Sequence, residues 1–141
     1  MPYVIGVVLA IGVAVFAKHV GLDRDRAFYP TVLIVVASLY VLFAAMSESV
    51  HMVLLESIAM IGFTIAAVAG FRSSTWIVVA GLAGHGLFDF VHGQILHNAG
   101  VPVWWPQFCG TYDGVAAAGL AWLIMLRSAA SRRAITWPEA A

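Results

Sequence analysis

Long runs of apolar residues, each about the length of a membrane-spanning helix, follow one another along almost the whole chain. A helix of about 20 apolar residues crosses the roughly 30 Å hydrocarbon core of a bilayer. Five such runs occur, at about 2–18, 28–46, 50–71, 74–97 and 110–128. The connections between them are short, which favours antiparallel neighbours. The pattern predicts an all-α protein, a single integral membrane bundle of five transmembrane helices with a short C-terminal tail at 129–141.

The composition agrees with a membrane protein. Of the 141 residues, 62% are hydrophobic and 10% are charged, and the mean hydropathy is +0.96. These values lie outside the range of soluble globular domains. The basic residues are too few and too scattered for a nucleic-acid-binding surface. The expected partners are the lipid bilayer and a small-molecule or lipid substrate.

Small residues are concentrated in the last two predicted helices, where Gly and Ala recur every few positions. Such residues allow helix backbones to approach closely in lipid. We therefore expect the fourth and fifth helices to pack tightly against each other. The same Gly and Ala faces would also allow a homo-oligomer.

Positive charge is distributed unevenly. All seven Lys and Arg residues fall at the end of the first predicted helix, in the connections after the first and third helices, or near the C-terminus. With five spans these segments share one side of the membrane, and the excess of Lys and Arg marks that side as cytoplasmic. The sequence predicts a multi-pass protein of the inner (plasma) membrane, with its N-terminus outside and its C-terminus in the cytoplasm.

Ionisable residues interrupt the fourth apolar run. His85, Asp89 and His92 stand at i, i+4 and i+7, which places them within an arc of about 60° on one helix face. An Asp at the centre of a membrane helix costs about 2.5 to 3.5 kcal/mol on insertion scales. Such a residue marks a functional site by default.

Other helices supply similar side chains to the outer half of the bundle, where no Lys or Arg falls. At about 1.5 Å per residue, Glu56 lies roughly 9 Å, Asp89 roughly 12 Å and Asp113 roughly 5 Å from the outer edge. Imidazole and carboxylate are ligands for Zn, Fe, Mn and Cu. We predict a divalent-metal pocket open to the outer face, most plausibly for zinc, with iron or copper as alternatives. The candidate metal ligands are His51, Glu56, His85, Asp89, His92 and Asp113.

If the pocket is catalytic, the metal would activate a water molecule and a remaining carboxylate would act as general base. The candidate catalytic residues are Asp89, Glu56 and Asp113. Two other interpretations stay open. The polar residues could form a purely structural cluster in a membrane interaction subunit, or they could serve a proton- or metal-ion-coupled transporter.

Two features near the fifth helix allow more than one interpretation. The single cysteine, Cys109, excludes an internal disulfide, and it could be a soft metal ligand, a buried thiol or an intermolecular bridge. The loop 101–108 contains Trp104 and Trp105, which suit the headgroup region or could form a lid over the pocket.

Three stretches of the chain resemble a family of small bacterial integral membrane proteins classed only as a domain of unknown function: GLDRDRAFYPTVLIVVASLYVLFA, GHGLFDFVHG and PVWWPQFCGTYDG. The resemblance covers most of the chain and implies no activity. A weaker likeness is to the transmembrane zinc hydrolases of the alkaline ceramidase and adiponectin-receptor type. Ser47 and His51 match their Ser-x3-His spacing, and Asp89 stands for their Asp, although their seven spans and their His-x3-His pair are absent. This likeness implies amide or ester hydrolysis if the protein is an enzyme.

The charge distribution generates a topology prediction. A C-terminal fusion to green fluorescent protein should fluoresce, and a C-terminal fusion to alkaline phosphatase should be inactive, because the basic connections place the C-terminus in the cytoplasm. An active alkaline phosphatase fusion would contradict the five-span arrangement and the depths derived from it.

Overall fold

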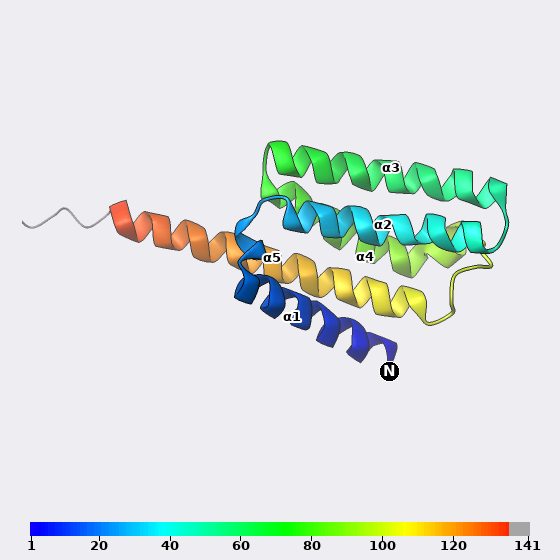
Figure 1. Ribbon diagram of the computed structural model, residues 1–141, viewed down its shortest axis with the longest axis horizontal. Coiled ribbons are helices and arrows are strands. Elements are labelled where there is room, and N and C mark those ends of the chain that lie inside the picture. The colour runs from blue at the N-terminus through cyan, green and yellow to red at the C-terminus, as the bar shows by residue number, and fades with distance from the viewer. Residues whose placement is uncertain (136–141) are drawn as a thin grey trace, which may run out of the picture.

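The computed structural model describes residues 1–135, which form five α-helices and one short 3-10 helix (Figure 1). The elements are α1 (Pro2–Val20), η1 (Leu22–Arg24), α2 (Phe28–Met46), α3 (Val50–Arg72), α4 (Thr75–Ile95) and α5 (Trp105–Ile135). No strand occurs among these residues. The predicted all-α fold is therefore confirmed.

Local sequence signals explain where several helices begin and end. Pro2 occupies the first turn of α1, where its missing N–H has no helical partner to lose. Gly21 ends α1 with φ 87, a left-handed conformation that glycine adopts without strain. Ser49 caps α3, because its Oγ accepts a hydrogen bond from the Met52 amide at 3.3 Å.

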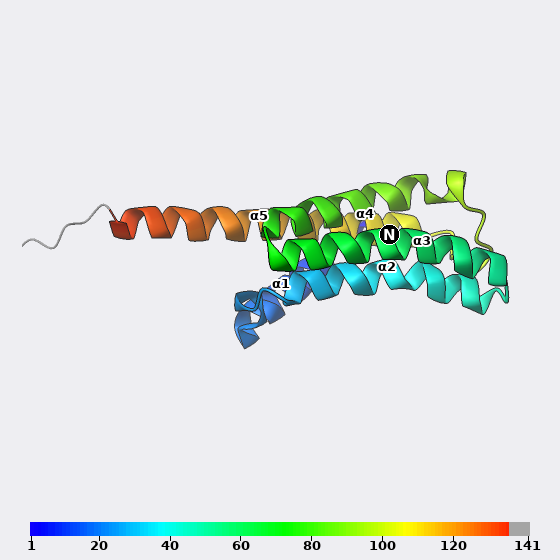
Figure 2. The same ribbon diagram turned by 90° about the horizontal axis from the view of Figure 1, so that it is seen from above.

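The helices run alongside one another, with α4 at the centre of the polar core. Helix α2 packs on α3 and α4, and α4 packs on α3 and α5, whereas α1 lies mainly against α5. Figures 1 and 2 show this arrangement, with α1 at one side of the bundle and α5 projecting well beyond the other helices. The buried polar residues of α4 are thus surrounded by three other helices.

The outer surface of the bundle is strongly apolar. Large hydrophobic side chains such as Val8, Leu54 and Trp122 each expose more than half of their surface. Within residues 1–135, four helices, α1, α2, α3 and α5, are long and apolar enough to cross a membrane. Helix α4 is not among them because it carries His85, Asp89 and His92. The membrane character is confirmed, while a fifth span by α4 stays a prediction.

The connection between α4 and α5 is shorter than the sequence suggested. Helix α5 begins at Trp105 rather than near 110, and α4 ends at Ile95 rather than 97, so the prediction of a loop over the whole of 101–108 was wrong. Pro106 explains the error, because proline is compatible with the first turn of a helix. Asp113 therefore lies about two turns inside α5, roughly 12 Å from its start instead of 5 Å.

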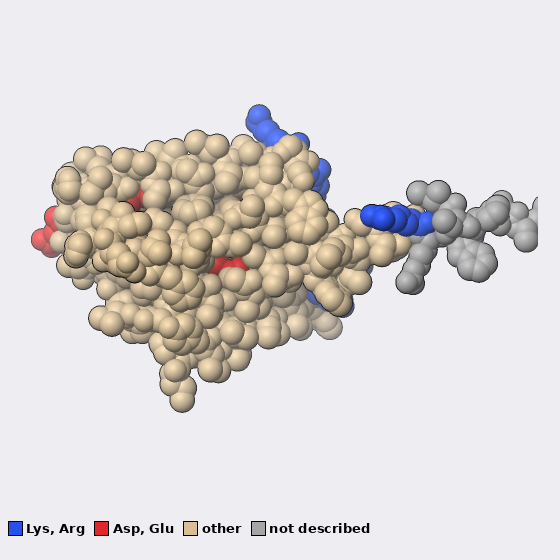
Figure 3. Space-filling view, turned by 180° about the vertical axis from the view of Figure 1, so that it is seen from behind, with Lys and Arg blue, Asp and Glu red and all other residues tan. Residues whose placement is uncertain are grey.

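The basic connections meet at one end of the bundle. Arg26 donates to the Ser73 carbonyl oxygen at 3.3 Å, and Arg127 donates to the Asp23 carbonyl oxygen at 2.8 Å. These bonds join residues that are far apart in sequence. Figure 3 shows Lys and Arg gathered toward this end, and acidic side chains at the opposite end and within the face between the two ends.

Helices α4 and α5 approach each other closely through glycine. A Cβ atom added at Gly86 would lie 2.9 Å from the Gly110 carbonyl oxygen and 3.2 Å from the Asp113 Cβ. The expected tight packing of these helices is confirmed. It also brings Asp113 next to the polar face of α4.

Replacing Gly86 with Ala should destabilise the bundle, because the added methyl group would push α5 away from α4. Overpacking of this kind costs about 1–3 kcal/mol, measurable as a lower thermal unfolding midpoint in detergent micelles. Gly84→Ala is the matched control, since a Cβ at Gly84 meets nothing within 4 Å. Equal stability of Gly86→Ala and Gly84→Ala would contradict the close approach.

Candidate functional site

Polar side chains form the centre of the bundle between α2, α3, α4 and α5. Six buried residues share this character, namely Glu56, His85, Asp89, His92, Asn98 and Asp113. All but Asn98 were predicted as site residues. Of the predicted ligands, only His51 differs, because it is exposed in the first turn of α3.

One group of these residues, which we call the Asp113 cluster, consists of His85, Asp89, Cys109 and Asp113. His85 Nδ1 lies 2.6 Å from Asp113 Oδ2 and 3.7 Å from Asp89 Oδ2. One ligand atom from each of the four residues lies within 4.8 Å of all the others, and all four residues are buried. The cluster could therefore hold a metal ion.

The acids of the Asp113 cluster are only partly satisfied by hydrogen bonds. Asp89 Oδ2 and Asp113 Oδ1 are buried and have no hydrogen-bond partner in the part of the chain that the structure describes. Both carboxylates form an ion pair with His85, at distances below 4 Å. Buried carboxylate oxygens without partners are rare in native proteins, because the interior does not replace their lost hydration. A cation at this position would supply the missing interaction.

Tyr40 of α2 fixes the orientation of Asp89. Its hydroxyl donates to Asp89 Oδ1 at 2.7 Å, and the contact is buried. The other oxygen of Asp89 is thereby left to face His85. Sequence reasoning missed Tyr40, although a tyrosine in the middle of an apolar span requires a partner for its hydroxyl.

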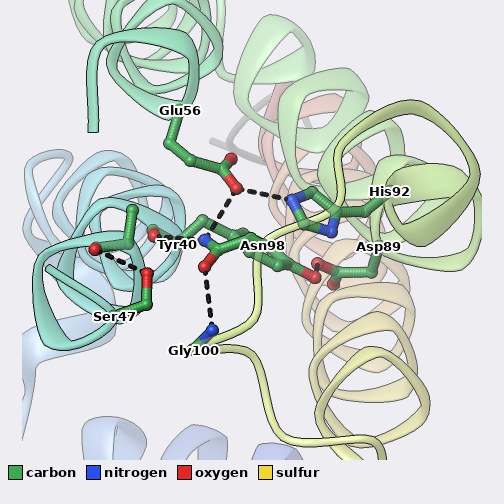
Figure 4. Close-up of polar contacts among 8 residues, drawn as sticks. Tyr40, Ser47, Glu56, Asp89, His92, Asn98 and Gly100 are labelled. Atoms are coloured by element: carbon green, nitrogen blue, oxygen red, sulfur yellow. Dashed lines mark hydrogen bonds and ion pairs between the residues drawn. The ribbon is translucent and has the colours of Figure 1, made fainter. Parts of the chain in front are cut away.

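A second group, the Glu56 cluster, consists of Glu56, His92 and Asn98 (Figure 4). Glu56 Oε1 lies 2.8 Å from His92 Nε2 and accepts a hydrogen bond from Asn98 Nδ2 at 2.9 Å. Asn98 also donates to the Tyr40 carbonyl oxygen at 3.2 Å. One side chain of the α4–α5 connection thus links that connection to α2 and α3.

Gly100 completes the fold of this connection. Its amide donates to Asn98 Oδ1 at 3.1 Å. A Cβ atom at position 100 would collide with the Phe43 carbonyl oxygen, so the chain passes α2 at a distance that requires glycine. Asn98 lies in a segment without regular secondary structure, and nothing in the sequence pattern indicated that it would be buried.

Aromatic rings lie between the two clusters and contact the histidines of both. The Tyr40 ring stacks on the His92 ring with centroids 4.0 Å apart and lies 6.2 Å from the His85 ring. Phe63 contacts His85 edge-on at 4.8 Å. Phe88 contacts His92 in the same manner at 5.4 Å. Tyr40 therefore lies between the clusters and contacts both.

The predicted proximity of the acids and histidines is confirmed, and its form differs from expectation. His92 Nε2 lies 2.8 Å from Glu56 Oε1, and His85 Nδ1 lies 2.6 Å from Asp113 Oδ2. The sequence predicted one shared pocket, whereas the side chains form two clusters. Cys109 belongs to the Asp113 cluster because α5 begins early enough to bury it.

The residues behind the likeness to zinc hydrolases are separated in the structure. Ser47 lies at the end of α2, where its hydroxyl donates to the Ala44 carbonyl oxygen at 2.9 Å. His51 is exposed nearby. Asp89, by contrast, lies in the buried Asp113 cluster. Trp105 packs edge-on against Phe43 at 4.8 Å, and a tryptophan lid over the pocket stays a prediction.

Two hollows adjoin the polar core. A cavity of about 450 Å³ lies at the α4–α5 connection and is lined by His92, His97, Asn98 and small or apolar residues of 93–106. A groove of about 290 Å³ between α1, α2 and α5 is lined mostly by apolar side chains and by Tyr112, next to Asp113. The first hollow reaches the Glu56 cluster. The second follows the side of α5 that faces α1 and α2.

Comparison with protein-family models, with curated proteins and with solved structures gave no match. The fold and the site themselves define the class of protein. It is a bundle of membrane-type helices that encloses a buried His, Asp and Cys cluster able to hold a metal ion.

Replacing Tyr40 with Phe should lower the free energy of unfolding by about 1–3 kcal/mol, because the buried Asp89 carboxylate loses its hydroxyl partner. The ring stacking on His92 is kept, so the change isolates the hydrogen bond. Chemical unfolding in detergent micelles measures the effect. Tyr3→Phe is the control, since Tyr3 is 50% exposed, and an equal effect of the two substitutions would contradict the role of Tyr40.

Proposed function

We propose that this protein is a five-span inner-membrane protein that binds one divalent transition-metal ion, with zinc preferred, in the Asp113 cluster. The observation that carries the proposal is the convergence of His85, Asp89, Cys109 and Asp113, whose ligand atoms lie within 4.8 Å of one another in a fully buried position. Helix α4 is the fifth span, and the basic end of the bundle faces the cytoplasm.

Charge balance supports a metal ion over a purely hydrogen-bonded cluster. Two carboxylates lie beside one imidazole, and within residues 1–135 their ion pairs closer than 4 Å are to that histidine alone. Arg26 and Arg127 form their hydrogen bonds at the opposite, basic end. A divalent ion would neutralise both carboxylates at once and would give partners to the unpaired oxygens Asp89 Oδ2 and Asp113 Oδ1.

The donor set favours zinc. One nitrogen, one sulfur and two carboxylate oxygens match the ligands of four-coordinate tetrahedral sites, in which Zn–N and Zn–O distances are about 2.0–2.2 Å and Zn–S is about 2.3 Å. Ligand atoms around such an ion lie about 3.3–3.6 Å apart. The observed spread, up to 4.8 Å, needs only side-chain adjustment to reach this geometry. The single thiol also disfavours Mg and Ca, which prefer oxygen.

Metal-dependent hydrolysis of a lipid is the second candidate function. The groove between α1, α2 and α5 favours it, because the groove is apolar, open at the side of the bundle and lined by Tyr112 beside Asp113. A hydrolase needs a metal position open to water. If His85, Asp89 and Asp113 are the only protein ligands, the fourth position can hold that water, and Cys109 then lies outside the coordination sphere.

Elemental analysis of the purified, metal-replete chain tests the metal site. The wild type should contain about one equivalent of zinc, and Asp113→Asn should lose most of it, because a tetrahedral site deprived of one charged ligand binds far more weakly. Asp25→Asn is the matched control, since Asp25 is exposed at the basic end. Wild-type protein without metal would overturn the proposal.

Cys109→Ser in the same assay separates the two candidate functions. Loss of zinc assigns Cys109 as the fourth ligand of a closed site. Full retention of zinc leaves one coordination position for water and favours the hydrolase.

A further inference from the structure

The Glu56 cluster contains a buried carboxylate that its neighbours only half satisfy. Glu56 is 1% exposed, and both of its polar partners, His92 and Asn98, bind the same atom, Oε1. The second oxygen, Oε2, is buried without a hydrogen-bond partner. A carboxylate in this state has an unused binding capacity for a cation.

The position of the Glu56 cluster suggests a role for the unpaired carboxylate oxygen of Glu56. His92 and Asn98 line the 450 Å³ cavity at the α4–α5 connection, and both contact Glu56 Oε1. His92 follows Asp89 by three residues on the same face of α4. The Glu56 cluster therefore lies between the cavity and the Asp113 cluster.

Polar groups continue from the cavity to the Asp113 cluster and stop there. Asn98 donates to the Tyr40 carbonyl oxygen and the His92 ring stacks on the Tyr40 ring, and the Tyr40 hydroxyl in turn donates to Asp89. Toward the basic end the core consists of apolar side chains, among which Leu33, Val78 and Leu82 are completely buried. Ions can therefore reach the Asp113 cluster more easily from the cavity side, because apolar packing would leave an ion without ligands.

We propose that Glu56 and His92 form a loading site that a divalent metal ion occupies on its way between the cavity and the Asp113 cluster. This inference rests on the proposed metal-binding function. Glu56 Oε2 and the His92 imidazole supply two ligands, and water from the cavity supplies the others. Two protein ligands without sulfur bind an ion weakly, which suits a position that must release the ion inward.

The test measures the rate of metal loading separately from the amount bound. Purified apo-protein in detergent is mixed with Zn²⁺, and uptake is followed by competition with a chromophoric chelator. Glu56→Gln and His92→Gln should still bind about one tight equivalent in the Asp113 cluster, as the wild type does, but should load it about tenfold more slowly. Glu48→Gln and His51→Gln are matched controls, since both residues are exposed, and they should load at the wild-type rate.

Wild-type loading rates in both Glu56→Gln and His92→Gln would overturn the loading site and leave the metal site intact. An absence of metal binding in the wild type would instead overturn the proposed function itself, and the loading site with it. The two failures are therefore distinguishable.

A titration of the wild type with Co²⁺ keeps the inference testable if the variants do not fold. The first equivalent should show thiolate-to-cobalt charge transfer from Cys109, or only ligand-field absorption if Cys109 is not a ligand. A second, weaker equivalent should show ligand-field absorption from nitrogen and oxygen ligands only. Saturation at one equivalent would overturn the loading site.

Discussion

The structure depends on one constraint, which is that carboxylates placed in an apolar bundle must find all their partners inside it. Lipid supplies no hydrogen bonds and no counter-ions. Glu56, Asp89 and Asp113 come from three different helices, and each is held within 3 Å by a histidine or a tyrosine hydroxyl. Helix α4 supplies both histidines and one of the acids, so α2, α3 and α5 must all lie against its polar face.

Tyr40 makes the two polar clusters a single connected unit. Its hydroxyl holds Asp89, its ring stacks on His92, and its backbone oxygen accepts from Asn98. Three kinds of interaction thus converge on one residue of α2. A shift of this helix would alter the Asp113 cluster and the Glu56 cluster together, which makes the core cooperative in the sense of a hydrogen-bond network.

Hydropathy and helical periodicity predicted the helices and the polar face of α4, because both depend on short segments that the sequence displays directly. His85, Asp89, Glu56 and Asp113 were identifiable because charge within an apolar run is conspicuous. Tyr40, Asn98 and Cys109 were less visible, since their roles arise from contacts between segments 40 or more residues apart or from the exact start of α5. Separation into two clusters likewise depends on side-chain directions, which spacing alone does not define.

The length of helix α5 has a mechanical consequence. The helix runs without interruption from Trp105 to Ile135, and its C-terminal part projects beyond the other helices (Figure 1). From Asp113 to its end the helix measures about 33 Å at 1.5 Å per residue. A tilt of about 1° at Asp113 displaces the far end by about 0.6 Å at this length. By geometry alone, a small change in helix direction at the buried Asp113 becomes a larger displacement at the C-terminal end of α5.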